Sequence, residues 1–422
     1  MNDRIVLGNG YSFSTDCKET GINNNVAVIG CTGSGKTCSV VIPRLLNTFD
    51  TNLVLTDPKR ELFEKFAPVF RSRGYNVAEL NLDSPSKSNI CFDPLYYTET
   101  SEDISKLASS LINMLPSGER VDKFWDYSSI LLAELILRFT LQFKEGANFA
   151  DFLQQSRAIE MNENSSSVAK LSIYPVMKDF ELNNPSHPLT ACYRNMHEIA
   201  GKTLASVLIS MRTILAVAFN SEIEDMFRKK PSFDIGRFVS EKSALFITTD
   251  GSDEGIDAYV NLIYETFLKS LMKKAKEYPG GILPIPVHLI MDDFACGAKI
   301  NAFPKMISTF RSKGISSTII LQDESQLVSM YGESGAKTIL NNNDTMVYLG
   351  GNDIKTARDM SERLNLPIED ILYMPLNSIF FFRRGQNPVK ATRYPLFEDP
   401  KYAEICNQAK AANNKKLLRL IR

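Results

Sequence analysis

The sequence is poor in the residues that build metal and disulfide sites. Its 422 residues include three histidines and seven cysteines, and no two cysteines form a C-x-x-C pair. Zinc sites and disulfide frameworks need such residues at short spacings. The scattered pattern argues against both and against a histidine-based triad, and it predicts reduced thiols in the cytosol. His288, inside an apolar run, is interpreted as a core or edge residue.

Long apolar runs and a net charge of either sign are also missing. No run of about 18 apolar residues occurs, and residues 1–8 do not resemble a signal peptide, so no transmembrane helix is expected. The 48 basic and 49 acidic residues give a formal net charge of −1. Because there is no global basic footprint, any contact with a polyanion must come from local patches.

A glycine-rich segment carries the clearest functional signal. Residues 30–37, GCTGSGKT, fit G-x-x-x-x-G-K-[ST], with an apolar run before them and a helix-compatible segment after them. Glycines allow successive N–H groups to face phosphate oxygens, and a helix N-terminus adds partial positive charge. Lys36 is predicted to reach the β- and γ-phosphates and Thr37 to bind Mg²⁺. The predicted nucleotide-binding residues are Gly30, Thr32, Gly33, Ser34, Gly35, Lys36 and Thr37.

An acidic pair follows a second apolar run. Residues 287–291 are strand-like, and Asp292 and Asp293 come directly after them. Ligands of α/β sheets bind at the carboxyl ends of the strands. Asp292 is therefore predicted to hold the Mg²⁺ shell, and Asp293 to orient or deprotonate an attacking water. Taken alone, the pair could equally be a solvated turn.

Two more polar residues lie in a helix–strand segment at 303–322. Gln322 ends the buried strand and could sense the γ-phosphate, or simply bond to a loop. Arg311 lies on the helix surface, where it could act on the phosphoryl group of a neighbouring subunit or form a surface ion pair.

Short apolar, β-branched runs alternate with helical segments, which predicts an α/β fold with a mainly parallel central sheet. Residues 102–219 instead show helical periodicity throughout. We predict a nucleotide-binding domain at 1–101 and 220–422, with an all-α domain inserted at 102–219; the alternative is that these helices cover the sheet. The strand candidates are 26–29, 53–56, 76–80, 244–249, 287–291, 316–321, 345–349 and 378–382.

Several segments together resemble the type IV secretion coupling proteins, the TraG/TraD-like conjugative DNA-transfer ATPases. DPKREL at 57–62 is similar to the family's D-P-K-G-E-L, and DDFACGAKI at 292–300 resembles D-E-F-A-x-x-G-K-I. RSKGI at 311–315, followed by LQ at 321–322, matches R-S-[RK]-G-I and its L-Q. The other similar segments are FDPL at 92–95, FWD at 124–126, NNNDTMVYLGG at 341–351, RG at 384–385 and YPLF at 394–397.

The resemblance implies a RecA-like P-loop domain carrying an all-α domain, assembled as a homo-hexameric ring. It implies ATP and Mg²⁺ as ligands, and transport of single-stranded DNA with its attached relaxase to a type IV secretion channel. By residue, Asp292 would serve the metal, Asp293 the water, Gln322 the sensing of phosphate, and Arg311 a neighbouring subunit. The expected location is cytoplasmic, peripheral at the inner face of the bacterial cell membrane. Most members begin with membrane-spanning helices, and here such an anchor is expected either to have been removed or to be a separate subunit.

Two positions depart from the family pattern. Asp293 stands where the family has Glu, and its side chain is shorter by one methylene. A misplacement of about 1 Å can cost on the order of 100-fold in rate. Arg60 replaces the family's Gly, which is expected to alter the loop after the second strand.

The functional alternatives stay open. A nucleotide-binding adaptor that recruits secretion substrates without fast hydrolysis is favoured by Asp293. A double-stranded DNA pump of the FtsK/HerA type shares the phosphate loop, but the helical region and the DPK-like and YPLF segments speak against it. Basic clusters could bind phosphates in a ring, or lie on solvated faces; they are at 228–230, 273–276, 383–384 and 415–422.

Overall fold

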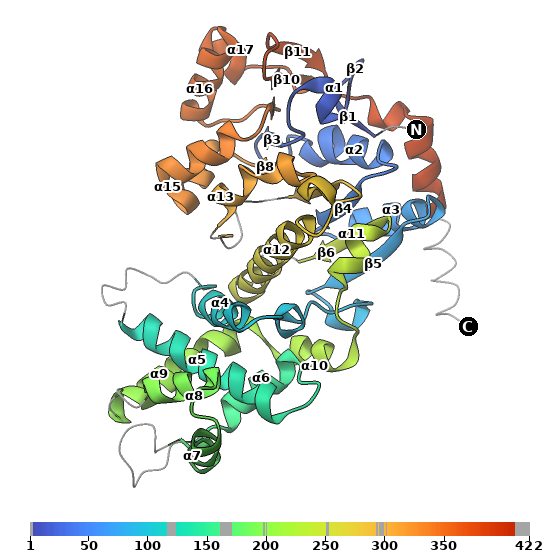
Figure 1. The fold of residues 1–422 in the computed structure, drawn as a ribbon. Helices are drawn as coiled ribbons and strands as arrows, with labels where there is room; N and C mark the ends of the chain where they lie inside the picture. Colours follow the sequence, from blue (N-terminus) through green and yellow to red (C-terminus); the bar gives the residue numbers. More distant parts are fainter. Residues whose placement is uncertain are drawn as a thin grey trace, which may run out of the picture. The chain divides into compact units, whose positions relative to one another are not determined.

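The computed structural model in Figure 1 shows an α/β protein with a large central sheet and many helices. All structural statements below concern the residues that it describes. These are 3–115, 124–160, 171–196, 199, 201–249, 253–292, 294, 299–300 and 302–409.

The chain divides into two compact units, each described by itself below. The first comprises Met1–Asp83, Asp234–Asp250 and Leu268–Arg422, and the second Ser84–Phe233 and Gly251–Phe267. The second unit is therefore wider than the helical region predicted at 102–219. The division into a nucleotide-binding domain at 1–101 and 220–422 and an all-α domain at 102–219 remains a prediction.

A nine-stranded sheet forms the centre of the first unit, in the order β11-β10-β9-β3-β8-β7-β4-β6-β5. Neighbouring strands from β9 to β5 are parallel, whereas β10 is antiparallel to both β9 and β11. The predicted parallel α/β fold is confirmed. The strands are β3 (Val26–Ile29), β4 (Asn52–Thr56), β5 (Asn76–Asn81), β6 (Ser243–Thr248), β7 (Val287–Met291), β8 (Ile315–Leu321), β9 (Thr345–Tyr348), β10 (Ser378–Arg383) and β11 (Val389–Thr392).

Every strand candidate from the sequence is found, within one residue at either end. Strand β11 and the small antiparallel pair of β1 (Arg4–Gly8) and β2 (Tyr11–Ser14) were not predicted from the sequence. The main helices of this unit are α3 (Glu61–Ser72), α11 (Ile235–Ser240), α15 (Glu324–Asn341), α16 (Ile354–Leu364) and α17 (Ile368–Leu372). Shorter ones are α1 (Cys17–Thr20), η1 (Thr37–Val41), α2 (Ile42–Leu46), α13 (Phe303–Ile307) and α14 (Phe310–Lys313).

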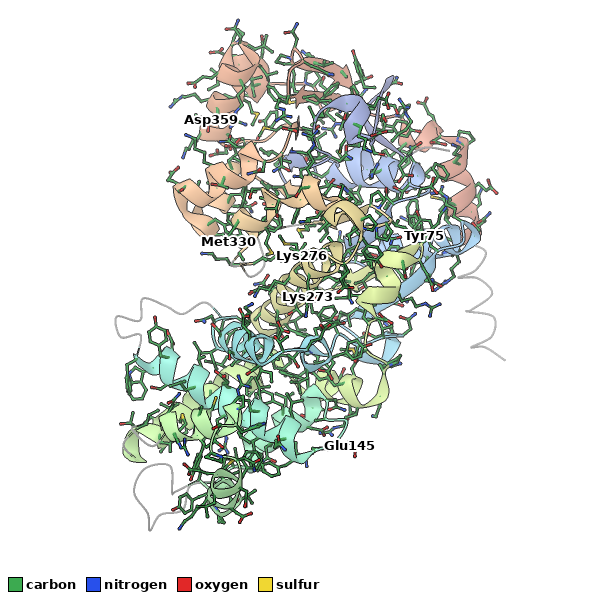
Figure 2. The ribbon with its side chains drawn as sticks, viewed as in Figure 1. Tyr75, Glu145, Lys273, Lys276, Met330 and Asp359 are labelled. Atoms are coloured by element: carbon green, nitrogen blue, oxygen red, sulfur yellow. The ribbon has the colours of Figure 1, made fainter. Side chains whose placement is uncertain are left out.

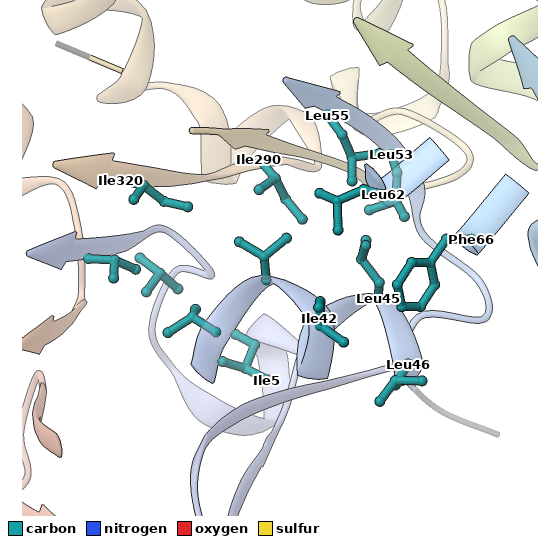
Figure 3. Close-up of a cluster of buried hydrophobic side chains, with 14 of the residues drawn as sticks. Ile5, Ile42, Leu45, Leu46, Leu53, Leu55, Leu62, Phe66, Ile290 and Ile320 are labelled. Atoms are coloured by element: carbon teal, nitrogen blue, oxygen red, sulfur yellow. The ribbon is translucent and has the colours of Figure 1, made fainter. Parts of the chain in front are cut away.

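Aliphatic side chains join the central strands to α2 and α3. Figure 3 shows Ile290 of β7 and Ile320 of β8 on the face of the sheet that packs against α2, in one cluster with Ile42 and Leu45 of that helix. Each of these residues is at most 3% exposed. Full burial of such a side chain stabilises the fold by about 1.5–3 kcal/mol. The helix that follows the glycine-rich loop is thus fixed firmly against the sheet.

The second unit is helical. Its helices are α4 (Ser101–Ile112), α5 (Phe124–Phe143), α6 (Phe149–Ala158), α7 (Tyr174–Asn183), α8 (Pro188–Asn195), α9 (Gly201–Ala218) and α10 (Ser221–Lys229), with the first part of α12 (Glu254–Ala275). Capping boxes start α4 at Thr100 and α6 at Asn148.

An aromatic cluster explains why this unit extends beyond 102–219. The Phe149 ring lies 4.8 Å from that of Phe219 and 5.4 Å from that of Phe227, and Tyr259 lies 5.2 Å from Phe219. Tyr259 donates a hydrogen bond to the Phe92 carbonyl oxygen at 2.6 Å. Residues on both sides of the predicted helical region therefore share its core.

Among the described residues, no single helix has the length and apolar composition needed to cross a membrane. One pair of helices, bent by 75°, meets that test only when taken together: Thr203–Ala218 with Ser221–Lys229.

Candidate nucleotide-binding site

The strand register brings the predicted motifs to one edge of the sheet. In the parallel pairs, Ile29 of β3 lies opposite Leu321 of β8, and Met291 of β7 lies opposite Ile319 of β8. The Gly30 N–H donates to the Leu321 carbonyl oxygen at 3.1 Å. The glycine-rich loop, Asp292 and Gln322 therefore follow three consecutive strands at their carboxyl ends, with β8 in the middle. Ligands of open α/β sheets bind at this edge.

The loop has the backbone geometry of a phosphate cradle. Gly33 and Gly35 adopt φ of 78° and 75°, a region that L side chains rarely enter. The Lys36 Nζ donates to the carbonyl oxygens of Gly30 and Cys31, at 2.7 and 3.3 Å. Thr37 opens η1 directly after the loop. Backbone N–H groups, a lysine and a hydroxyl thus gather within a few residues, a combination suited to polyphosphates.

Asp292 directly follows β7 and is half-buried. Asp293, the predicted partner of the water, lies outside the described residues. Phe294 anchors the turn, since its ring lies 4.7 Å from that of Phe303 and its N–H donates to the Ile320 carbonyl oxygen at 3.1 Å. The chain after β7 is therefore held to β8 beside Gln322.

Gln322 links β8 to the next helix. Its backbone N–H donates to the Gln326 side chain at 2.9 Å, and Asp323 caps α15 by accepting from the Gln326 N–H. The residue is half-buried at the carboxyl edge. Its predicted sensing role is untested by this geometry and remains a prediction.

His288 is a core residue, as the sequence analysis preferred. Its Nδ1 lies 2.7 Å from Ser316 Oγ and its Nε2 2.9 Å from Thr318 Oγ1. Burial, with a smaller contribution from the Arg44 charge, holds the pKa of His288 well below its usual value. The imidazole is thus neutral and fully engaged in joining β7 to β8.

Residues 2–365 match the family model described as "Type IV secretory system Conjugative DNA transfer". That match covers most of the chain. The chain belongs to this family. Protein VirD4 of Rhizobium rhizogenes is 22% identical over 351 residues, which cover 80% of this chain and 48% of VirD4. The chain thus spans about half the length of the curated relatives it matches.

Solved structures of coupling proteins share this fold. The unbound bacterial conjugative coupling protein TrwBdeltaN70 matches with a TM-score of 0.63 and 17% identity, over 92% of this chain and 88% of TrwB. TrwB in complex with ADP and Mg²⁺ matches with a TM-score of 0.60 and 17% identity, over 88% and 85%. At this identity the likeness establishes the fold alone, and it agrees with the predicted RecA-like architecture.

Arg60, which replaces the coupling-protein glycine, adopts φ of 60° just before α3. This conformation explains why glycine suits the position. The Arg60 side chain is bonded to Glu79 at 2.5 Å and to Glu64 at 2.9 Å, and lies over the Phe63 ring at 4.9 Å. The loop thus differs from the family pattern as expected: Arg60 keeps a left-handed backbone conformation, and its side chain joins Glu79, Glu64 and Phe63.

Asp57, which opens the DPK segment of this chain, has a structural role. It is 2% exposed and accepts a hydrogen bond from the Phe63 N–H at 2.7 Å, at the start of α3. Burial raises the pKa of the Asp57 carboxyl, and hydrogen bonds from the Phe63 and Leu62 N–H groups oppose this rise. The carboxylate therefore joins β4 to α3.

Arg311, the predicted trans-acting arginine, lies on α14 and is exposed. Its Nη2 donates to the Cys17 carbonyl oxygen at 3.4 Å. No carboxylate of the described chain lies within ion-pair distance of its guanidinium. The alternative of an ion pair is thus unsupported within these residues, and the trans role remains a prediction.

The basic clusters are largely paired or outside the described residues. Arg228 and Lys229 pair with Glu224 and Asp225 on the same helix, at 2.7 and 2.6 Å. Near the end of α12, Lys274 pairs with Glu277, while Lys273 and Lys276, labelled in Figure 2, are exposed. The cluster at 415–422 lies beyond the described residues. The solvated-face interpretation thus suits 228–230 best.

Arg393 is a loop-contacting residue that the sequence analysis missed. Its guanidinium donates to the carbonyl oxygens of Ser34, Leu349 and Ser378, at 2.6, 3.1 and 3.2 Å. The available signal was its position immediately before the YPLF segment. That segment contains no pattern that predicts a contact with the phosphate loop, 359 residues earlier in the chain.

Proposed function

We propose that this chain is the ATP-driven motor part of a coupling protein. It binds ATP and Mg²⁺ and drives single-stranded DNA, with an attached relaxase, toward a type IV secretion channel. The observation that carries the proposal is the shared edge: the phosphate loop, Asp292 and Gln322 follow β3, β7 and β8. Membership of the DNA-transfer family supports the substrate, and TrwB has been solved with ADP and Mg²⁺.

The donor atoms at this edge suit magnesium. Mg²⁺ prefers hard oxygen ligands, and Thr37 and Asp292 offer a hydroxyl and a carboxylate. When bound, the ion neutralises charge that develops on the transferring phosphoryl group. Lys36 exchanges its two carbonyl partners for phosphate oxygens. Gly30, Thr32, Gly33, Ser34 and Gly35 present the loop backbone to the phosphates.

The remaining assignments concern hydrolysis and assembly. Asp293 orients the attacking water, Gln322 senses the γ-phosphate, and Arg311 acts on the nucleotide of the neighbouring subunit in a homo-hexamer. An arginine supplied across an interface stabilises transition-state charge. The exposure of Arg311 and the lack of a carboxylate partner among the described residues support that role. We place the assembly at the inner face of the cell membrane, docked on channel components.

Steady-state ATP hydrolysis with and without single-stranded DNA tests the proposal. We expect DNA to stimulate the rate and Lys36→Ala to abolish it, because the loop then lacks its phosphate-binding cation. Lys390→Ala, which removes an exposed lysine of β11, serves as the control and should keep the wild-type rate. A rate in Lys36→Ala equal to that of wild type would contradict the motor assignment.

A non-hydrolysing adaptor is the second candidate, and Asp293 in place of the family's Glu favours it. Wild type that binds ATP without turnover on any DNA would establish this alternative. Asp293→Glu should then raise the rate, since the longer side chain moves the carboxylate by about 1 Å, a displacement that is worth on the order of 100-fold. A fall in rate would show that Asp293 is already well placed.

A further inference from the structure

The guanidinium of Arg393 joins three separate parts of the first unit. Nη1 donates to the Ser34 carbonyl oxygen in the phosphate loop at 2.6 Å, and Nη2 to the Leu349 carbonyl oxygen just after β9 at 3.1 Å. Nε donates to the Ser378 carbonyl oxygen at the start of β10, at 3.2 Å. All three nitrogens of one rigid, planar group are thus committed to backbone carbonyls.

The backbone around Arg393 is itself well fixed. Its N–H donates to the Asn377 carbonyl oxygen at 3.0 Å, and it directly follows β11, which pairs with β10. Three residues later the chain is anchored again, since Leu396 is 2% exposed within the main core cluster. Arg393 therefore offers the loop a rigid support rather than a mobile side chain.

The bond to Ser34 has a direct consequence for the phosphate loop. In a trans peptide the C=O and the following N–H point in opposite directions. Because Arg393 holds the Ser34 carbonyl oxygen, the Gly35 N–H points away from the guanidinium. Within the described residues this N–H bonds to no acceptor, whereas the Gly35 carbonyl accepts from the Ser39 N–H at 2.8 Å. One of the donors expected to meet phosphate is thus aimed by Arg393.

The charge of Arg393 is also available to the loop. No carboxylate of the described chain lies within ion-pair distance of its guanidinium, and all its hydrogen bonds go to neutral carbonyls. Burial lowers the pKa of Arg393 from its ordinary value, but a guanidinium stays protonated at neutral pH. The positively charged guanidinium therefore contacts the loop directly, with Nη1 2.6 Å from the Ser34 carbonyl oxygen.

We propose that Arg393 is a positioning residue of the nucleotide site: it clamps the Ser34 carbonyl so that the Gly35 N–H faces phosphate, and adds positive charge behind the loop. The inference rests on the proposed binding of nucleotide and deepens it. In this proposal, the antiparallel strands β10 and β11 at the edge of the sheet help to hold the phosphate loop through Arg393.

The test measures the affinity of the full chain for Mg-ATP and Mg-ADP by titration calorimetry in Arg393→Ala, Arg393→Lys and Arg393→Gln. We expect Arg393→Ala to raise Kd about 10-fold, or ~1.4 kcal/mol. Arg393→Lys should bind nucleotide more tightly than Arg393→Ala because it keeps the positive charge. Arg393→Gln should also bind more tightly than Arg393→Ala, because it keeps a hydrogen-bond donor. Lys390→Ala, which removes an equal charge from a β11 side chain lying over the Phe380 ring, should stay within about 2-fold.

Two further readouts separate positioning from mere stability. The affinity gap between wild type and Arg393→Gln should narrow at 1 M salt, since a charge contribution is screened there. In hydrolysis, KM should rise more than kcat falls. A purely structural residue would lower Tm and leave Kd of the folded protein unchanged, and this outcome would overturn the proposal. Should Arg393→Ala not fold, the Lys and Gln variants carry the same comparison.

The controls distinguish failure of the clamp from failure of the site. Suppose that wild type binds nucleotide, that Lys36→Ala does not, and that all Arg393 variants bind with the wild-type affinity. The proposed role of Arg393 is then wrong, and the assignment of the nucleotide site is retained. If wild type binds neither nucleotide, the site itself is wrong and the clamp falls with it.

Discussion

Two turns at the carboxyl edge of the same sheet meet the same backbone requirement in different ways. After β3, the chain adopts positive φ at Gly33 and Gly35, where no side chain has to be accommodated. After β4, positive φ falls on Arg60, whose side chain is paired with Glu79 and Glu64. Glycine avoids the steric cost of about 1–2 kcal/mol, whereas Arg60 carries it and offsets it through ion pairs.

The difference decides what each turn can do. The loop after β3 has small residues and exposes its backbone N–H groups, so it can take a phosphate. The turn after β4 is covered by a guanidinium that reaches Glu79 on β5, so it serves as a structural joint between β4, α3 and β5. The family pattern has glycine at both turns, and in this chain only the turn after β3 keeps it.

The largest effect, a loss of nucleotide affinity, is expected when a glycine of the phosphate loop is replaced by alanine. A Cβ added at Gly35 would lie 3.0 Å from Arg393 Nη1, whereas one at Gly33 would meet nothing within 4 Å. Both positions have positive φ, so both alanine variants bear similar backbone strain. Gly35→Ala should therefore weaken Mg-ATP binding about 10-fold more than Gly33→Ala, a difference of ~1.4 kcal/mol. Equal losses in calorimetric titrations would show that contact with Arg393 is irrelevant.

A smaller difference between two paired variants is expected at Arg60. Arg60→Ala keeps the positive φ and removes the ion pairs, and should lower the free energy of unfolding by about 2 kcal/mol. Arg60→Gly removes the same pairs but relieves the strain, so it should be about 1 kcal/mol more stable than Arg60→Ala. Urea unfolding followed by circular dichroism gives this difference. If the two variants are equally stable, positive φ at this position carries no cost.

The smallest effect is a pH dependence at the β4 turn. The pKa of Asp57 is raised in the folded state, so between the unfolded value near 3.8 and the folded value the folded state binds more protons. The free energy of unfolding of wild type, relative to Asp57→Asn, should therefore increase as pH falls through that window. Unfolding curves of both proteins from neutral pH to pH 4 measure the difference. A relative decrease would mean that the Asp57 carboxylate is favoured in its charged form.

The sequence predicted what depends on local pattern. Apolar runs such as 287–291 and 316–321 are long enough and branched enough to be recognised as buried strands, and the glycine loop has a fixed spacing. Short, half-exposed strands such as β11 carry no comparable signal, because Val389–Thr392 alternates without a strong apolar face. The β1–β2 pair is equally short, although its Asn9-Gly10 turn was a usable sign.

Relations between distant segments were harder to predict. Arg393 contacts Ser34 only because β9 and β10 place the end of β11 beside the phosphate loop, and one sequence contains no trace of that register. The structural role of Asp57 was hidden for a similar reason, since its partner is the backbone of Phe63 rather than a side chain. The joining of residues 84–101 to the helical unit depends on packing around Tyr259, which lies far along the chain.

The central claim is that the phosphate loop and the end of β7 serve one magnesium-bound nucleotide, and the Mg²⁺ dependence of ATP affinity tests it most directly. We predict that Mg²⁺ tightens ATP binding about 10-fold in wild type and in Asp370→Asn, an exposed carboxylate variant of α17. Asp292→Asn should lose most of that enhancement, and Lys36→Ala should lose binding itself. Full Mg²⁺ enhancement in Asp292→Asn, together with unchanged affinity in Lys36→Ala, would contradict the account.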